Sequence, residues 1–306
     1  MGAAESVTNT SLAIDVEVTE YNESGYAGDT GTLACVRKHL LVVLVLLAAA
    51  CSNEEAPFAL VANSDLGVGP ERLLLGLRTL DEGAPLEEPD RPIEVELFAP
   101  EDLEEPFARM PADFIWLVED LRGVYAAPFT FPSAGMWAVR LIASDLPATD
   151  LTLFQVLEHS VSPAVGDPAP PSITPTLKEA PLELLTTDPA PDASFYEVSI
   201  VEAVGSGKPT VVVFATPAFC QTATCGPTLD NVKSIRAEYP AVNFVHVEVF
   251  DLARTPNELV PVPAVDEWHL RSEPWVFVID ADGNVAARFE GVVTPDELRA
   301  VLDPLA

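Results

Sequence analysis

Positively charged residues are scarce in this sequence. Its 306 residues include 16 lysines and arginines against 48 aspartates and glutamates, which gives a formal net charge of -32. Proteins that bind nucleic acids neutralise phosphates with a basic stripe or patch, and this composition offers no such surface. It therefore predicts no nucleic-acid partner and indicates a solvated acidic surface.

Cysteine is scarce as well. The chain has four, and Cys35 and Cys51 fall in an N-terminal segment that we expect to lie outside the folded part. The remaining two, Cys220 and Cys225, follow a buried-looking run at 210–214 and precede an amphipathic run at 229–239. A helix N-terminus stabilises a thiolate, so a cysteine-bearing loop at this place favours thiol chemistry.

The N-terminal segment lacks an apolar run long enough to cross a bilayer. The run Leu40–Ala50 is shorter than the about 20 residues that a spanning helix needs. It follows the basic pair Arg37-Lys38 and ends in small residues before Cys51, which is typical of a signal peptide. We predict a signal peptide over residues 36–51. Residues 1–35 have acidic but no basic residues, so we interpret them as a mis-called or disordered extension.

The end of this segment, Leu47-Ala-Ala-Ala-Cys51, resembles the lipobox of bacterial lipoproteins. In that family the cysteine becomes the lipidated N-terminus, although leucine is usual where this chain has Ala48. The resemblance implies lipidation at Cys51 and a protein anchored to the cell membrane on its extracytoplasmic side. The alternative is an ordinary cleavage site that happens to precede a cysteine.

Residues 57–158 contain short β-like runs separated by turn residues. In Ile93–Phe98 apolar and acidic residues alternate, as in a strand with one solvated face. Runs of this kind predict an antiparallel sandwich. The predicted strands cover 58–62, 72–78, 93–98, 123–127 and 137–142.

One stretch of this region resembles small extracytoplasmic immunoglobulin-like domains of the YtkA and FixH kind. It reads Gly123-Val-Tyr125, then an aromatic strand, then Gly135-Met-Trp137. The resemblance implies an immunoglobulin-like sandwich that serves as a binding or spacer module. Some relatives bind copper, but the region has no cysteine and too few other soft ligands for such a site. We interpret Tyr125 and Trp137 as core residues.

Proline is concentrated in residues 159–192, which we interpret as a linker. Eight prolines between 161 and 192 predict an extended, semi-rigid chain that is not part of a packed core. Within it, Val165–Pro171 resembles the lead-in of TlpA-like and peroxiredoxin-like proteins of the thioredoxin fold.

Residues 193–306 predict an α/β region. The order is a helix, a strand, the cysteine loop, a helix, a strand, a short helix, two strands joined by a turn, and a last helix capped by Thr294-Pro-Asp-Glu297. This order resembles the thioredoxin fold, as does the dipeptide Glu273-Pro274 before the strand at 275–280. In that family a cis-proline at this place faces the active cysteine, which implies a substrate-binding role for Glu273 and Pro274. The predicted elements cover 195–204, 209–214, 229–239, 242–250, 264–269, 275–280 and 284–289.

The spacing of the two cysteines departs from the thioredoxin pattern, in which two residues separate them. Here four residues do, and five steps of an ideal helix rise about 7.5 Å, whereas a disulfide needs Cα atoms within about 7 Å. Both cysteines therefore cannot be bonded within one regular helix. We expect Pro227 at the first helical position, with Cys225 just before the helix and Cys220 in the loop.

Either cysteine is a candidate for the attacking thiol. Cys220 lies close behind the strand, whereas Cys225-Gly-Pro-Thr228 mimics the family's Cys-Gly-Pro-Cys sequence with threonine at the second cysteine. Both alignments imply thiol–disulfide exchange with protein thiols or disulfides and no cofactor. Two alternatives stay open: a copper chaperone of the Sco kind using Cys220, Cys225 and His269, and a non-enzymatic surface binding protein with a structural disulfide.

The sequence thus predicts a multidomain protein. An all-β immunoglobulin-like sandwich at 57–158 is followed by the linker at 159–192 and an α/β thioredoxin-like domain at 193–306. The predicted function is thiol–disulfide oxidoreduction outside the membrane, through Cys220 and Cys225.

Overall fold

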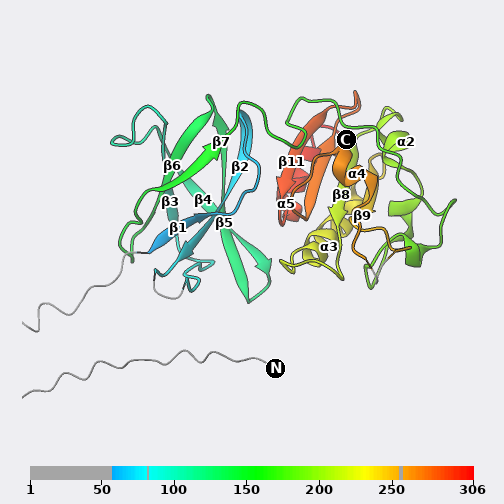
Figure 1. Cartoon of the computed structure of the whole chain (residues 1–306), viewed down its shortest axis with the longest axis horizontal. Coiled ribbons are helices and arrows are strands. Elements are labelled where there is room, and N and C mark those ends of the chain that lie inside the picture. The colour runs from blue at the N-terminus through cyan, green and yellow to red at the C-terminus, as the bar shows by residue number, and fades with distance from the viewer. Residues whose placement is uncertain (1–56, 81–82, 255–257) are drawn as a thin grey trace, which may run out of the picture. The chain divides into compact units, whose positions relative to one another are not determined.

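The computed structural model describes residues 57–80, 83–254 and 258–306 (Figure 1). The predictions for residues 1–35, for the signal peptide at 36–51 and for lipidation at Cys51 lie outside the described residues. Within the described ranges, no helix has the length and apolar character needed to cross a membrane. The described strands form two sheets, one of seven strands and one of four.

The seven-stranded sheet is antiparallel throughout and has the strand order β1-β2-β5-β4-β3-β6-β7. Its two edge strands approach each other, since the hydroxyl of Thr152 on β7 donates to the carbonyl of Ala59 on β1 at 2.9 Å. The sheet therefore curls into a near-barrel. Its strands are β1 (Phe58–Val61), β2 (Gly69–Arg78), β3 (Ile93–Phe98), β4 (Ala108–Val118), β5 (Arg122–Phe131), β6 (Gly135–Ala143) and β7 (Thr152–Val156).

Strand β4 corrects the expectation of two separate sheets. Its first part, 108–112, pairs with β3, and its second part, 113–118, pairs with β5, so one long strand joins both halves of the sheet. Pro111 pairs with Glu94 of β3 in the part of β4 that has no partner on its other side. The missing N–H of a proline is tolerated at such an unpaired edge. An all-β antiparallel region is confirmed, whereas the immunoglobulin-like identity stays a prediction.

The mostly aliphatic core of the seven-stranded sheet includes buried aromatic side chains. Trp137 and Tyr125 are fully buried, as predicted, and each has a polar partner. The indole N–H of Trp137 donates to the carbonyl of Ser133 at 3.0 Å, and the Tyr125 hydroxyl donates to the carbonyl of Glu88 at 3.1 Å. These bonds remove the cost of burying a donor without a partner.

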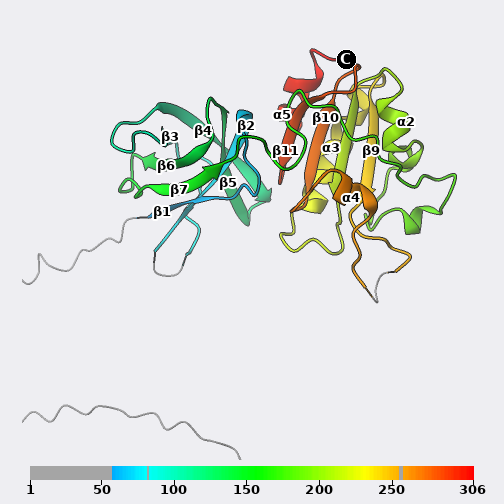
Figure 2. The same cartoon turned by 45° about the horizontal axis from the view of Figure 1, so that its top comes forward.

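The four-stranded sheet has the order β11-β10-β8-β9, with β8 and β9 parallel and the other pairs antiparallel (Figure 2). Strand β8 is buried along its whole length, which explains why its sequence is almost entirely apolar. The helices and strands of this C-terminal region are α2 (Ile200–Val204), β8 (Thr210–Ala215), α3 (Cys225–Ile235), β9 (Asn243–Glu248), α4 (Pro263–Glu267), β10 (Trp275–Ile279), β11 (Val285–Glu290) and α5 (Pro295–Leu302). It also has the 3-10 turns η2 (Ala193–Tyr196) and η3 (Arg236–Glu238).

The helix predicted over 195–204 is broken in two. The 3-10 turn η2 ends at Tyr196, and α2 begins only after Ser199. Ser199 and Glu202 form a capping box, in which the serine hydroxyl accepts from the Glu202 N–H and the glutamate accepts from the Ser199 N–H. This reciprocal cap fixes a new helix start. The capping box predicted at Thr294 and Glu297 of α5 is confirmed.

The proline-rich segment is packed, contrary to the prediction that it lies outside any core. It has one 3-10 turn, η1 (Leu182–Leu184), and is otherwise irregular, yet Ser172, Thr174 and Thr176 are all buried. The Ser172 hydroxyl accepts from the indole of Trp268 at 3.1 Å. The Thr174 hydroxyl likewise accepts from the backbone N–H of Ile200 at 3.1 Å. Hydroxyl side chains of this segment thus satisfy buried N–H donors of the domain, and the number of prolines alone does not predict this packing.

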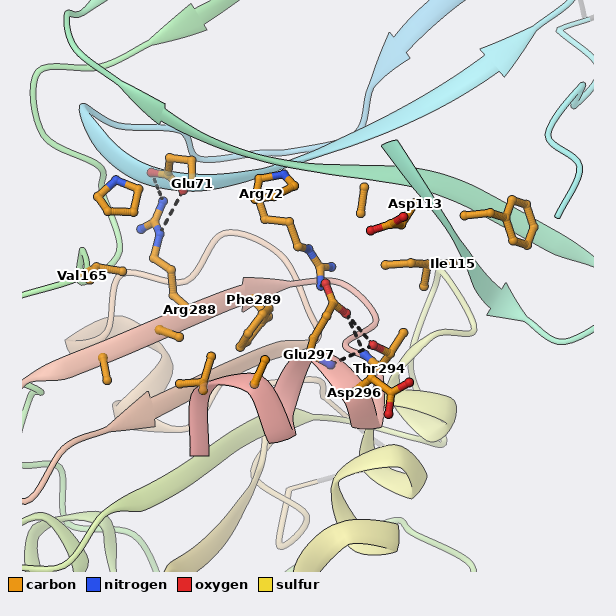
Figure 3. Close-up of a pocket in the computed structure, with 18 residues that line it drawn as sticks. Glu71, Arg72, Asp113, Ile115, Val165, Arg288, Phe289, Thr294, Asp296 and Glu297 are labelled. Carbon is orange, nitrogen blue, oxygen red and sulfur yellow. Dashed lines mark hydrogen bonds and ion pairs between the residues drawn. The ribbon is translucent and has the colours of Figure 1, made fainter. Parts of the chain in front are cut away.

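Arginine side chains connect the regions of the two sheets. Arg288 of β11 is almost fully buried and contacts the carboxylates of Asp65 and Glu71 at 3.5 and 2.9 Å. Arg72 of β2 points to Glu297 of α5 and forms an ion pair of 2.8 Å with it (Figure 3). Glu71, Arg72, Arg288 and Glu297 line a cavity of about 720 Å³, whose lining residues come from both sheets and do not include a cysteine.

Candidate active site

Cys220 and Cys225 form a disulfide with a Cα–Cα distance of 6.0 Å. Cys225 is the first residue of α3 and Cys220 lies in the preceding loop, so the two are not in one helix, as the spacing predicted. The expected helix start was wrong by two residues, because Thr224 is the N-cap and Pro227 stands inside the first turn. Proline is tolerated there since the first N–H groups of a helix have no partner within it.

The two cysteines differ in exposure. Cys225 is fully buried, whereas Cys220 is partly exposed. The sulfur of Cys220 accepts a hydrogen bond from the backbone N–H of Cys225 at 3.2 Å and lies 3.3 Å from the hydroxyl of Thr222. Donors of this kind stabilise negative charge on sulfur, as does the helix start itself. The accessible and stabilised sulfur is therefore that of Cys220.

Hydroxyl groups brace the loop that carries the disulfide. Thr222 and Thr224 are joined through their hydroxyls at 2.6 Å, and the Thr228 hydroxyl donates to the carbonyl of Thr224 at 2.9 Å. Ala223 adopts a left-handed conformation with φ of 62°, which turns the chain into the helix. At the other end of the loop, the ring of Phe219 packs edge-on against Phe250.

The Glu273-Pro274 peptide bond is cis, as expected from its place before the strand at 275–279. The carbonyl of Pro274 accepts from the N–H of Gly291 at 2.9 Å. The hydroxyl of Thr228 on α3 lies 3.5 Å from the carbonyl of the same glycine. Gly291 thus connects the cis-proline to the helix that begins at Cys225, while substrate binding by Glu273 and Pro274 stays a prediction.

His246 is a satisfied core residue. Its Nδ1 accepts from the Tyr196 hydroxyl at 2.6 Å, and its Nε2 lies 3.0 Å from the carbonyl of Ala215, to which it donates. Both contacts are satisfied by the neutral ring with its proton on Nε2. Burial lowers the pKa of His246 to about 4, so the ring stays neutral at physiological pH.

Glu248 is a buried carboxylate that the sequence analysis missed. It pairs with Ala215 at the carboxyl end of β8, where the cysteine loop begins. Its Oε2 accepts from the backbone N–H of Thr187 at 2.8 Å and from the Thr187 hydroxyl at 2.7 Å, and that hydroxyl also accepts from the N–H of Ala218. Burial raises the pKa of Glu248. An acidic residue at the end of a strand parallel to β8 was the available signal.

No metal-binding cluster of three or more histidine, cysteine or acidic side chains occurs within residues 57–80, 83–254 and 258–306. His269 follows α4 with a positive φ of 54° and does not join the two cysteines in such a cluster. The set proposed for copper, Cys220, Cys225 and His269, therefore has no support from the geometry.

Residues 196–306 match the family model described as a thioredoxin-like domain. The parallel pair β8 and β9, the hairpin β10–β11 and the cis-proline agree with that match. Residues 196–306 form a thioredoxin-like domain. The match covers only this C-terminal part of the chain.

Two solved structures resemble the chain weakly. DsbF of MTB, solved in mixed oxidized and reduced forms, has 22% sequence identity and a TM-score of 0.26, over 33% of this chain and 82% of that one. A putative thiol:disulfide interchange protein DsbE from Chlorobium tepidum has 19% identity and a TM-score of 0.31, over 47% of this chain and 99% of that one. Comparison with curated proteins found no match.

Proposed function

We propose that this protein is a thiol–disulfide oxidoreductase that acts on protein partners through Cys220 and Cys225. The observation that carries the proposal is the asymmetry of the pair. A partly exposed sulfur with two hydrogen-bond donors is bonded to a fully buried one at the start of a helix. A structural disulfide does not require one accessible sulfur, whereas exchange with a partner does.

The exchange reaction follows from this geometry. A partner thiolate attacks Cys220 Sγ, the Cys220–Cys225 bond breaks, and Cys225 leaves as a thiolate that takes up a proton. A second partner thiolate then attacks the partner sulfur of the mixed disulfide and releases Cys220 as a thiolate. The partner loses two electrons and two protons and becomes a disulfide, while the Cys220–Cys225 pair becomes a dithiol. The reverse sequence reduces a partner disulfide.

The experiment measures exchange by the full chain with a dithiol peptide and with its oxidised form. We expect the oxidised protein to convert the dithiol peptide to its disulfide, and the Cys220→Ser/Cys225→Ser double variant to be inactive. If oxidised wild-type protein does not oxidise the dithiol peptide and reduced wild-type protein does not reduce the peptide disulfide at pH 7, the bond is structural and the proposal is overturned. Reaction with both forms gives the reduction potential, and hence the preferred direction.

We further propose that the protein works outside the cytoplasm, anchored by lipid at Cys51. The lipobox-like sequence supports this, and persistent protein disulfides fit an oxidising compartment. Metabolic labelling with radioactive palmitate should label the wild-type protein and not a Cys51→Ala variant. Equal labelling of both would reject the anchor and leave the exchange chemistry untouched.

A further inference from the structure

The loop between β8 and α3, residues 216–224, carries Cys220, and we call it the redox loop. It has a contact from the seven-stranded sheet. Arg122 is the first residue of β5, next to the turn that joins it to β4, and its guanidinium donates to the carbonyl of Thr222 at 2.5 Å. The hydroxyl of the same threonine lies 3.3 Å from the sulfur of Cys220. One residue therefore separates the guanidinium of one sheet from the accessible sulfur that follows the other.

A second contact joins the seven-stranded sheet to the chain just after β11. Val292, just after β11, is buried in an apolar cluster with residues of the seven-stranded sheet. Arg72 of that sheet donates to the carbonyls of Glu290 and Val292 at 3.1 and 2.6 Å. These bonds hold the chain on both sides of Gly291, which is joined to Pro274 and Thr228. The sheet residues of the cluster are Leu74, Ile115, Val124 and Ala126.

The charges around the loop make the position of Arg122 significant. Within residues 196–306 the buried carboxylate of Glu248 is linked to Ala218 of this loop through Thr187. Lys233 of α3 is engaged by Asp188 at 2.6 Å and Asp230 at 2.9 Å. Within the part of the chain that the structure describes, Arg122 is the cationic side chain that hydrogen-bonds to the loop between β8 and α3.

We propose that Arg122 is a positioning residue of the redox site, by which the seven-stranded sheet holds the Cys220 loop in place and supplies it with a positive charge. This rests on the proposed function and deepens it. In the oxidised protein the guanidinium fixes the carbonyl of Thr222 and, through this residue, the hydroxyl beside Cys220. In the reduced protein the same charge favours the Cys220 thiolate, because a nearby cation stabilises an anion.

The test uses the reduced full chain and follows alkylation of Cys220 by iodoacetamide as a function of pH, read by mass spectrometry on the peptide that contains Cys220. Only the thiolate reacts, so the midpoint of the profile reports its stability. We expect Arg122→Ala to raise the midpoint by about 0.5 to 1 pH unit at low salt, a partly screened effect of a single exposed charge. Arg122→Lys keeps the positive charge, so its midpoint should lie close to the wild-type value.

The matched control is Arg109→Ala. Arg109 is an exposed arginine on β4 that pairs with Glu96 of the same sheet, so its removal changes the net charge equally without touching the loop. It should leave the midpoint at the wild-type value. The Arg122→Ala shift should shrink in 1 M salt, where the Debye length is about 3 Å, whereas a purely steric role would persist.

An Arg122→Ala midpoint equal to that of wild type would overturn the inference, as would an equal shift in Arg109→Ala. Thermal melts establish that each variant is folded. The proposed function fails differently, since wild-type protein would then show no exchange with peptide, whatever the alkylation profiles of the Arg122 variants.

Discussion

The backbone N–H of Cys225 donates to the sulfur of Cys220, 3.2 Å away, so the buried cysteine supports the accessible one. We therefore expect Cys220 to be the attacking residue and Cys225 the resolving one. Cys225→Ser should accumulate a mixed disulfide after its Cys220 thiolate attacks a disulfide-containing partner and releases a thiol, because the thiol that resolves it is missing. Cys220→Ser should accumulate none, since the thiol of Cys225 is buried.

The measurement is non-reducing electrophoresis of each variant after incubation with an activated disulfide of a peptide. The Cys220→Ser/Cys225→Ser double variant is the control for labelling elsewhere. The opposite pattern, with adducts only on Cys225, would favour the alignment in which Cys225-Gly-Pro-Thr228 takes the place of the Cys-Gly-Pro-Cys sequence.

His246 gives a prediction for the pH dependence of stability. Burial lowers its pKa to about 4 in the folded protein, whereas an unfolded histidine titrates near pH 6.5. Between these values the unfolded chain binds a proton that the folded chain does not. The neutral buried His246 therefore costs no stability above about pH 6.5. Below that value the free energy of unfolding falls with decreasing pH, by roughly 3 kcal/mol in all, and the loss is complete below about pH 4.

Urea unfolding of wild type and His246→Asn between pH 7.5 and 4 tests this. The difference between the two curves isolates the histidine from the carboxylates that titrate in the same range. Wild type should lose stability faster than the variant as the pH falls below 6.5. Parallel curves would mean that the histidine is not held neutral.

The two arginines Arg288 and Arg299 should differ sharply in their effect on stability. Arg288 is buried against Asp65 and Glu71, so Arg288→Met leaves two buried carboxylates without their cation. We expect a loss of about 3–5 kcal/mol in the free energy of unfolding. Arg299 also contacts two carboxylates, but in solvent, so Arg299→Met should barely move the urea midpoint. Equal losses would show that burial does not decide the contribution.

Gly123 is required by the ring that lies against it. A Cβ at this position of β5 would lie 2.1 Å from the ring of Phe114 on the neighbouring strand. Gly123→Ala should therefore cost about 1–3 kcal/mol through overpacking. Combined with Phe114→Leu, which shortens the opposing side chain, it should cost less than the sum of the single changes. Strict additivity in this double-mutant cycle would contradict the clash.

The sequence predicted the elements whose signals are local. The strand Ile93–Phe98, the buried run in β8 and the capping box of Thr294 and Glu297 all occur. The solvated face predicted for the first strand was only half right, because Glu94 is exposed whereas Glu96 is buried in ion pairs with Arg109 and Arg140. Each depends on neighbours within a few residues, where spacing fixes the exposed face or the cap. Strand β4 was missed because Pro111 interrupts its pattern, and proline is tolerated there only by the particular pairing of that strand.

The candidate site was only half predictable for a related reason. The Cys220–Cys225 pair and the proline of Glu273-Pro274 stand in recognisable local sequences. Arg122 and Thr222, by contrast, are 100 residues apart along the chain, and the bond between Arg288 and Glu71 joins residues separated by 217. No periodicity or spacing connects such residues, so only the folded chain shows that the first sheet reaches the redox loop.

The position of Val292 has a thermodynamic consequence. Its apolar cluster belongs to the seven-stranded sheet, while its neighbour Gly291 contacts both the cis-proline Pro274 and Thr228 of the helix that begins at Cys225. Linkage between two sites is reciprocal. Any ligand that binds the seven-stranded sheet more tightly when the disulfide is intact must stabilise that disulfide by the same factor, and a reductant must weaken the ligand's hold equally.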